Sequence, residues 1–305
     1  MRKNIFLKKK KQKKNAKALI ITEGKTDWKH LKKALLRFQD LDLNIEFDEY
    51  ENRGSGEAYL KKQLDAYSSQ SNEQRIIGIF DRDTPKYVND YGEKLFVKII
   101  DKDYEKRLKE KVEKVYSDKS SPKYKAFEKN LEDGKYDKID EELNKILTGK
   151  DFEEWKKLSR NNVYAFCIPK IEDSDSPRTL NDICIEFYYK EKDLKRVTKD
   201  GKRLFFADEF ESNKDNKNDD NSKRFISKCG KYKTNSKKVK EGARAELTLI
   251  SAPIFKIDDE KCEKNILLSK NDFTNNIINE VEGFNNFDIE KFGLIFDVIE
   301  KILND

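Results

Sequence analysis

The chain has 305 residues and a mass of 36.0 kDa, enough for one large domain or two modest ones with a buried core. Charged residues make up 41% of it, but 11% aromatic residues argue against a disordered chain. No apolar stretch approaches the roughly 20 residues of a membrane helix or forms a signal-peptide core. These features exclude a membrane protein and predict a globular, highly charged, cytoplasmic one.

Positive charge is concentrated at the start of the chain. Residues 1–17 carry nine Lys or Arg and no acid, which leaves 56 of the 65 basic residues against 59 acidic ones. Such a segment is typical of a flexible solubilising arm. Alternatively, its lysines, among them Lys9, Lys10 and Lys11, attract nucleic-acid phosphates through counterion release.

Strand and helix patterns alternate through the first third of the sequence. An apolar strand at 17–22 leads into a turn and an amphipathic helix at 24–38, and a strand at 44–50 leads into a helix at 57–67. RIIGIF at 75–80 is a continuous apolar run, typical of a central parallel strand. The alternation predicts an α/β domain with a mostly parallel sheet flanked by helices.

The middle of the chain changes to sparse apolar residues among Lys and Glu. This pattern predicts a helical insertion, either a solvated hairpin or a surface for a partner or a second copy. A strand at 161–169 returns to the sheet, and 182–196 and 237–250 read as helices. The expected units are a basic arm (1–17), the first part of the core (18–100), the insertion (101–159), the second part of the core (160–255) with a disordered loop (212–224), and a helical tail (256–305).

Cysteine and histidine are poor candidates for the chemistry. Cysteines at 167, 184, 229 and 262 lack a CxxC pair, so neither a zinc site nor a disulfide framework is expected. The one histidine, His30, falls on the helix pattern of 24–38 and is interpreted as a flank residue. Carboxylate and lysine chemistry remain.

Three acidic residues follow apolar strands. Glu23 ends the first strand, and Asp81 and Asp83 follow RIIGIF, so all three are expected at the carboxyl edge of one sheet, where ligands bind in open α/β folds. An extended backbone would turn Asp81 and Asp83 to one face and Arg82 away. Crowded carboxylates repel one another unless a cation neutralises them, so the pattern predicts Mg²⁺ or Mn²⁺, with two ions expected.

One competing motif fails at a single position. IITEGKT resembles the end of a phosphate-binding Walker A loop, but that loop requires glycine at the position of Leu19. An NTPase is therefore not expected.

A strand, EGKTD, a helix, and a later strand followed by DRD together resemble the Toprim domain, a Rossmann-like fold. The resemblance covers about residues 18–90 and continues more loosely to 255. It places Glu23, Asp27, Asp81 and Asp83 on the family's acidic motif, and implies that Glu23, Asp81 and Asp83 bind metal and act in catalysis.

Within that family the chain looks most like the overcoming-lysogenisation-defect nucleases and related standalone effectors of phage defence. Those carry a further acidic residue and a lysine downstream, for which Glu186 (metal ligand) and Lys240 (catalytic) are the candidates. Lys237 and Lys238 compete with Lys240, and Glu186 could equally be a surface helix residue. The inserted helices depart from the pattern.

The resemblance implies a nuclease that cleaves DNA or RNA, with Lys25 and the basic arm contacting phosphates, and a defence or toxin role. Those nucleases come with an ATPase, so a separate ATPase subunit or a homodimer is an expected partner. The other candidates are a non-catalytic nucleic-acid-binding or regulatory subunit, and a small-molecule phosphatase or phosphotransferase.

Overall fold

The computed structural model describes residues 16–38, 41–51, 54–70, 72–100, 102–133, 135–152, 162–171, 183–212, 225–236, 239, 248–257 and 264–304. Lys9, Lys10, Lys11, Lys240 and most of the 212–224 loop lie outside these residues. Within the described ranges, no helix combines the length and the apolar character needed to cross a membrane.

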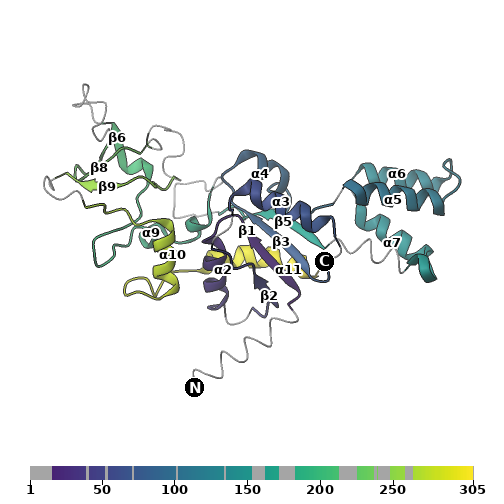
Figure 1. The fold of residues 1–305 in the computed structure, drawn as a ribbon, viewed down its shortest axis with the longest axis horizontal. Helices are drawn as coiled ribbons and strands as arrows, with labels where there is room; N and C mark the ends of the chain where they lie inside the picture. The colour runs from purple at the N-terminus through teal and green to yellow at the C-terminus, as the bar shows by residue number, and fades with distance from the viewer. Residues whose placement is uncertain are drawn as a thin grey trace, which may run out of the picture.

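A five-stranded sheet in the order β2-β1-β3-β5-β4 forms the centre of the molecule (Figure 1). Its first four strands are parallel neighbours, and β4 is antiparallel to β5 at the edge. The predicted α/β class and the central place of RIIGIF are confirmed. The strands are β1 (Ala18–Thr22), β2 (Ile45–Phe47), β3 (Arg75–Phe80), β4 (Val97–Lys98) and β5 (Val163–Cys167).

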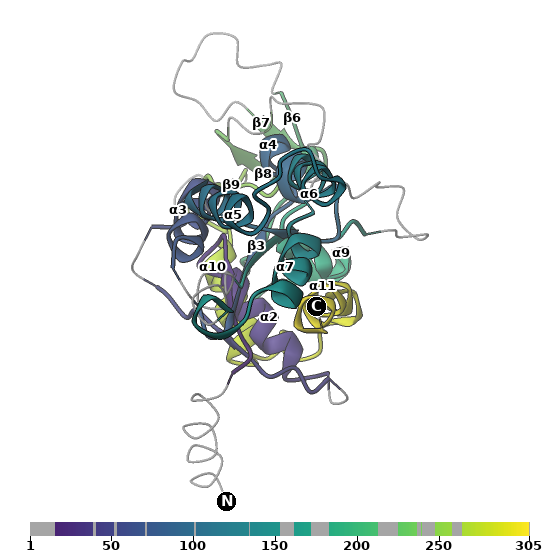
Figure 2. The ribbon, with the colours of Figure 1, turned by 90° about the vertical axis from the view of Figure 1, so that its right-hand side faces the viewer.

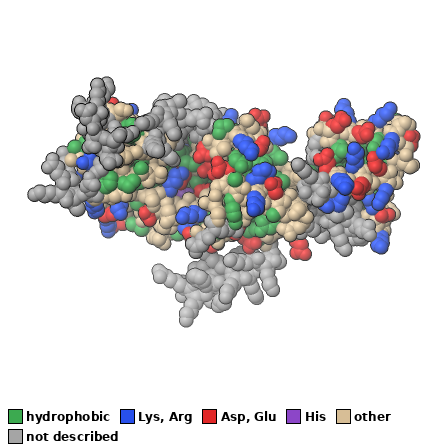
Figure 3. Space-filling model, turned by 45° about the horizontal axis from the view of Figure 1, so that its top comes forward, with side chains coloured by type: hydrophobic (Ala, Val, Ile, Leu, Met, Phe, Trp, Pro, Cys, Tyr) green, Lys and Arg blue, Asp and Glu red, His purple; other side chains and the backbone are tan. Residues whose placement is uncertain are grey.

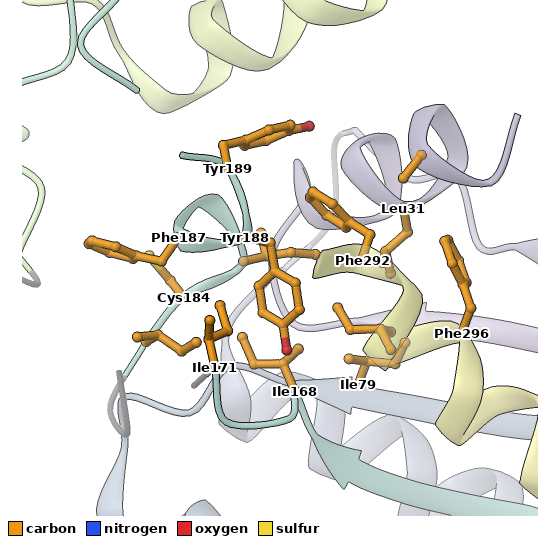
Figure 4. Packing of buried hydrophobic residues seen from close by; sticks show 14 of the residues in the cluster. Leu31, Ile79, Ile168, Ile171, Cys184, Phe187, Tyr188, Tyr189, Phe292 and Phe296 are labelled. Atoms are coloured by element: carbon orange, nitrogen blue, oxygen red, sulfur yellow. The ribbon is translucent and has the colours of Figure 1, made fainter. Parts of the chain in front are cut away.

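Helices cover both faces of this sheet. One face packs on α3 (Glu57–Ser68) and α4 (Pro85–Tyr91) through a cluster that includes Leu64 and Tyr91. The other face packs on helices from the two ends of the chain, through the larger cluster shown in Figure 4. These helices are α2 (Asp27–Leu35), α10 (Lys270–Ile278) and α11 (Gly293–Asn304), with the short η5 (Glu290–Phe292) before α11.

The helical insertion forms a lobe of its own (Figure 1), and Figure 2 views the molecule from the side of this lobe. Its helices are α5 (Lys102–Val115), α6 (Pro122–Glu132) and α7 (Tyr136–Ile146), and they share a separate hydrophobic cluster. Because β4 runs antiparallel to β5, the chain enters the insertion at the edge where the parallel strands begin. The insertion therefore leaves the sheet at the edge opposite the acidic residues.

A second, antiparallel sheet in the order β6-β7-β8-β9 lies on the other side of the central sheet from α5–α7 (Figure 1). It has its own cluster, built around Phe205 and Phe225. The chain enters this lobe after α9 (Glu191–Leu194) and returns to the core helices at Lys270, although Leu204, Phe206 and Leu249 still pack in the core cluster. Its elements are η2 (Ala207–Glu209), β6 (Phe210–Ser212), β7 (Phe225–Ser227), β8 (Tyr232–Thr234) and β9 (Ile254–Lys256).

The single helix predicted over 182–196 is wrong. The structure has a short 3-10 helix, η1 (Ile185–Tyr188), then extended backbone at Tyr189, then α9. Every residue from 183 to 189 is buried, whereas a helix at a surface buries only one stripe. The helix expected over 237–250 lies largely outside the described residues, and Leu249 within it forms an antiparallel bridge to Phe206.

Candidate metal and catalytic centre

Two adjacent parallel strands bring Glu23 and Asp81 together. Thr22 of β1 is paired with Ile79 of β3, so both chains leave the sheet at the same edge. The Glu23 amide donates to the Ile79 carbonyl at 3.1 Å, and the Glu23 carboxylate accepts from the Asp81 amide at 3.1 Å. Sheet register thus places the two acids side by side despite their separation of 58 residues in the chain.

The EGKTD turn is closed by its last residue. Asp27 is buried at the start of α2, and its Oδ2 accepts from the Gly24 amide at 2.6 Å. A Cβ on Gly24 would lie 2.5 Å from Oδ1 of Asp27, which is closer than non-bonded atoms approach. Glycine is required here because the carboxylate packs directly on its backbone.

The side chains of the DRD segment point in different directions. Oδ1 of Asp81 accepts from the Ile185 amide at 3.1 Å, and Asp83 is exposed at the rim. Arg82 is buried and points away, donating to the Ile168 carbonyl at 2.8 Å and to the Gly92 carbonyl at 3.1 Å. It ties the DRD turn to the ends of β5 and α4.

Glu186 lies in η1 and is 1% exposed, so the surface alternative for this residue is wrong. Its Oε2 lies 3.0 Å from the Lys270 ammonium, at the first position of α10. Lys270 also lies 3.4 Å from the Cys184 sulfur. Glu186, which was expected to bind metal, therefore forms an ion pair with Lys270.

Lys270 was not among the sequence candidates, because its segment reads as part of the helical tail. A local signal does mark it: Ser269 and Asp272 have the spacing of a helix amino-terminal cap, and the Ser269 hydroxyl accepts from the Asp272 amide at 3.0 Å. That cap fixes Lys270 at the head of α10. Nothing in the sequence indicates that this position meets Glu186.

Burial and mutual repulsion perturb the acids. Burial and the nearby Asp83 carboxylate raise the pKa of Glu23 to about 8, although the Asp81 amide lowers it. Burial and the Glu186 carboxylate raise the pKa of Asp27 to about 6. Burial, Asp27 and Glu23 also raise the pKa of Asp81. Strongly perturbed acids at one sheet edge are typical of a functional site.

The donor set suits a hard divalent cation, because carboxylate oxygens are the ligands that Mg²⁺ and Mn²⁺ prefer. A cation would also relieve the repulsion that raises the pKa of Glu23 and of Asp81. Within the part of the chain that the structure describes, however, no three His, Cys, Asp or Glu side chains stand in an arrangement that could hold a metal ion. Glu23 and Asp81 instead bind backbone amides.

His30 is not a flank residue as predicted. It is fully buried, and both ring nitrogens have hydroxyl partners at 2.9 Å, on Tyr189 and on Thr274. Lys25, expected to contact phosphates, is exposed within the EGKTD turn. The Tyr188–Tyr189 and Phe205–Phe206 pairs are buried core residues.

No protein-family model, curated protein or solved structure matches the chain. A functional assignment therefore rests on the residues of the site.

Proposed function

We propose that this protein is a Toprim-type nuclease that uses divalent metal to hydrolyse phosphodiester bonds in nucleic acid. The observation that carries the proposal is the meeting of Glu23 and Asp81 at the carboxyl ends of two adjacent parallel strands, where burial and neighbouring carboxylates raise the pKa of both. Acids that are costly to ionise together are best explained by a cation that binds among them.

In this proposal Glu23, Asp81 and Asp83 would hold Mg²⁺ or Mn²⁺ once Glu23 and Asp81 turn from the backbone amides to which they are hydrogen-bonded. When bound, the metal would supply Lewis acidity and a more acidic water molecule. Water attacks phosphorus and gives up a proton to the solvent, one P–O ester bond breaks, and the leaving oxygen takes up a proton.

Lys270 takes the catalytic role expected of Lys240: its ammonium stabilises charge on the phosphate and can supply that proton. Glu186 orients Lys270 through the 3.0 Å ion pair rather than serving as a direct ligand.

Unpaired lysines support a polyanionic substrate. Lys228, Lys231 and Lys233, around the turn between β7 and β8, form no ion pair within the described residues. Figure 3 shows Lys and Arg side chains on the lobe that carries β6–β9, and acidic side chains on the part of the central lobe that faces it.

The lysines of α2 differ, because each faces a glutamate. These pairs are Lys29 with Glu51 at 2.7 Å, Lys32 with Glu49, and Lys33 with Glu280 at 2.7 Å. A phosphate would have to displace a carboxylate at each of them. Within α2 and the turn before it, Lys25 is therefore the better phosphate contact.

The decisive experiment incubates labelled plasmid, single-stranded DNA and total tRNA with the full chain and Mg²⁺ or Mn²⁺. Asp81→Ala is compared with Asp90→Ala, which removes an exposed carboxylate on α4. We expect cleavage that chelator and Asp81→Ala abolish and that Asp90→Ala leaves intact, and the substrate cut identifies DNA or RNA. Cleavage that survives in chelator would contradict the proposal.

A second candidate is a non-catalytic nucleic-acid-binding or regulatory subunit. It is favoured by the backbone amides of Asp81 and Ile185, which already donate to the Glu23 and Asp81 carboxylates. This candidate predicts nucleic-acid binding without metal dependence and without cleavage. The defence or toxin role, the cytoplasmic location, and an ATPase or second-copy partner are proposals that rest on the Toprim resemblance.

A further inference from the structure

His30 joins three separate segments of the core. From α2, its Nδ1 lies 2.9 Å from the Tyr189 hydroxyl and its Nε2 lies 2.9 Å from the Thr274 hydroxyl of α10. His30 and Thr274 are fully buried and Tyr189 is 2% exposed. Figure 4 shows Tyr189 projecting away from Tyr188, which points into the hydrophobic cluster.

The direction of these hydrogen bonds follows from the number of protons. The Thr274 hydroxyl has one proton and donates it to the Lys270 carbonyl at 2.8 Å. Towards His30 it must therefore accept, which requires a proton on Nε2. Burial lowers the pKa of His30 to about 4, so the ring is neutral at pH 7 and Nδ1 accepts from Tyr189. Tyr189 thus donates to His30, His30 donates to Thr274, and Thr274 donates to the Lys270 carbonyl.

The same three residues share a spacing relative to the candidate site. Each follows a charged site residue on its own segment by three or four positions. The pairs are His30 with Asp27, Tyr189 with Glu186, and Thr274 with Lys270. The hydrogen bonds among His30, Tyr189 and Thr274 thus connect three segments. These are the segments whose charged residues act on Asp81.

We propose that His30 is a positioning residue that holds Asp27, Glu186 and Lys270 in register through its hydrogen bonds to Tyr189 and Thr274. The roles of the three positioned side chains rest on the proposed function, whereas the connection itself is independent of metal and of substrate. A buried histidine that only fills space would tolerate loss of these bonds without any change at Lys270.

The first test uses the fact that the chain has a single histidine. Nitrogen NMR of the full chain labelled with ¹⁵N-histidine gives one set of ring signals. We expect a neutral ring with its proton on Nε2 at pH 7 and no titration down to about pH 5. A proton on Nδ1, or titration near the ordinary histidine pKa of about 6.5, would overturn the hydrogen-bond chain.

The second test follows Lys270 itself. The rate at which an amine-reactive acetylating reagent modifies Lys270 is measured by peptide mass spectrometry on metal-free protein. Thr274→Val removes the hydroxyl and should raise that rate several-fold, because α10 is no longer tied to His30 and the Lys270 ammonium is less firmly held against Glu186. Thr274→Ser keeps the hydroxyl and should restore the slow rate.

Thr234→Val is the matched control. Thr234 is also fully buried, and its hydroxyl donates to the Pro253 carbonyl at 2.9 Å, but it lies in β8 of the other lobe. We expect it to leave Lys270 unchanged. Equal Lys270 rates in wild type, Thr274→Val and Thr234→Val would refute the positioning role.

A further variant keeps the test decisive if Thr274→Val does not fold. Tyr189→Phe removes only the hydroxyl that donates to His30, and should also raise the Lys270 rate. The rate at Lys264, an exposed lysine outside α10, should stay unchanged and serves as the internal control. An unaltered Lys270 rate in folded Tyr189→Phe would refute the positioning role. None of these measurements uses nucleic acid. If the protein gives the expected results in both tests but cleaves no nucleic acid, the proposed function is rejected while the positioning role of His30 holds.

Discussion

The Lys270 ammonium lies 3.0 Å from the Glu186 carboxylate, although 84 residues separate the two in the chain. The Glu186 side chain is 2% exposed and that of Lys270 is 44% exposed. Burial alone would raise the pKa of Glu186, but Lys270 lowers it to about 2, so the acid stays ionised. The pair is therefore a fixed charge centre beside Asp81 rather than a surface ion pair.

Removing the lysine should separate stability from activity. Lys270→Met leaves a buried charge unpaired, which we expect to cost about 1 to 3 kcal/mol in urea denaturation, discounted because the ammonium is partly solvated. Cleavage should fall by about 10² to 10⁴. The double variant with Glu186→Gln should recover stability without recovering cleavage. Lys264→Met, at an exposed lysine, is the control, and a fully active Lys270→Met would exclude the catalytic role.

Glu23 should make the metal-free protein less stable as the pH rises. Its folded pKa of about 8 exceeds its ordinary value of 4.5, so the folded state binds the proton more tightly. Stability is thus present below about pH 4.5 and is lost as pH rises through 8, by at most a few kcal/mol.

Thermal denaturation in chelator between pH 5 and pH 8 measures this loss, and Glu23→Gln should flatten it. Mn²⁺ should stabilise wild type more at pH 8 than at pH 5, because metal and proton compete for the carboxylate. A pH profile that Glu23→Gln leaves unchanged would assign the effect to another group.

The close packing of Gly24 and Asp27 predicts a coupled pair of substitutions. Gly24→Ala places a methyl group 2.5 Å from Oδ1 of Asp27. We expect it to destabilise the chain by about 1 to 3 kcal/mol, as overpacking does. In an Asp27→Ala background the clash is gone, so the same substitution should cost much less. Denaturation of the four proteins forms a double-mutant cycle, and additive costs would show that the two residues do not pack together.

The three lysines around the turn between β7 and β8 should contribute most of the affinity for nucleic acid. Charge reversal of Lys228, Lys231 and Lys233 should weaken binding and reduce the slope of log affinity against log salt by about 0.7 to 0.9 for each phosphate that is no longer neutralised. The control reverses three exposed lysines of α6: Lys123, Lys125 and Lys129. Fluorescence anisotropy with a labelled oligonucleotide compares the two triple variants. Equal weakening in both would indicate a diffuse charge effect rather than a binding surface.

The insertion should be removable. Lys98 of β4 is paired with Tyr164 of β5, and the Ile99 amide donates to the Val163 carbonyl at 2.9 Å, so the two strands form the arms of a hairpin. Replacing residues 101–161 with Asn-Gly should close that hairpin. We expect the shortened chain to keep cooperative unfolding and metal-dependent cleavage, because the acids lie at the opposite edge. Loss of folding would show that α5–α7 support the sheet.

The sequence alone determined the α/β class, the central position of β3 and the order of the first two strand-to-helix units. These follow from local periodicity, since alternating and continuous apolar runs specify how much of each element is buried. It also indicated that Glu23 and Asp81 end strands at the same edge of the sheet, because the carboxyl ends of parallel strands meet there. The tail helices were predicted for the same local reason.

Tertiary structure alone decided what surrounds those acids. Residues 183–189 are buried on all sides, so no amphipathic period distinguishes the turn at Glu186 from a helix. Lys270 and His30 have partners 84 and more than 150 residues away. Their pairing depends on how α10 packs across α2, which no local pattern encodes. A buried charged or polar side chain needs a hydrogen-bonding partner, because leaving it unpaired away from water costs free energy. Which residue becomes that partner depends on the packing of segments that are distant in sequence.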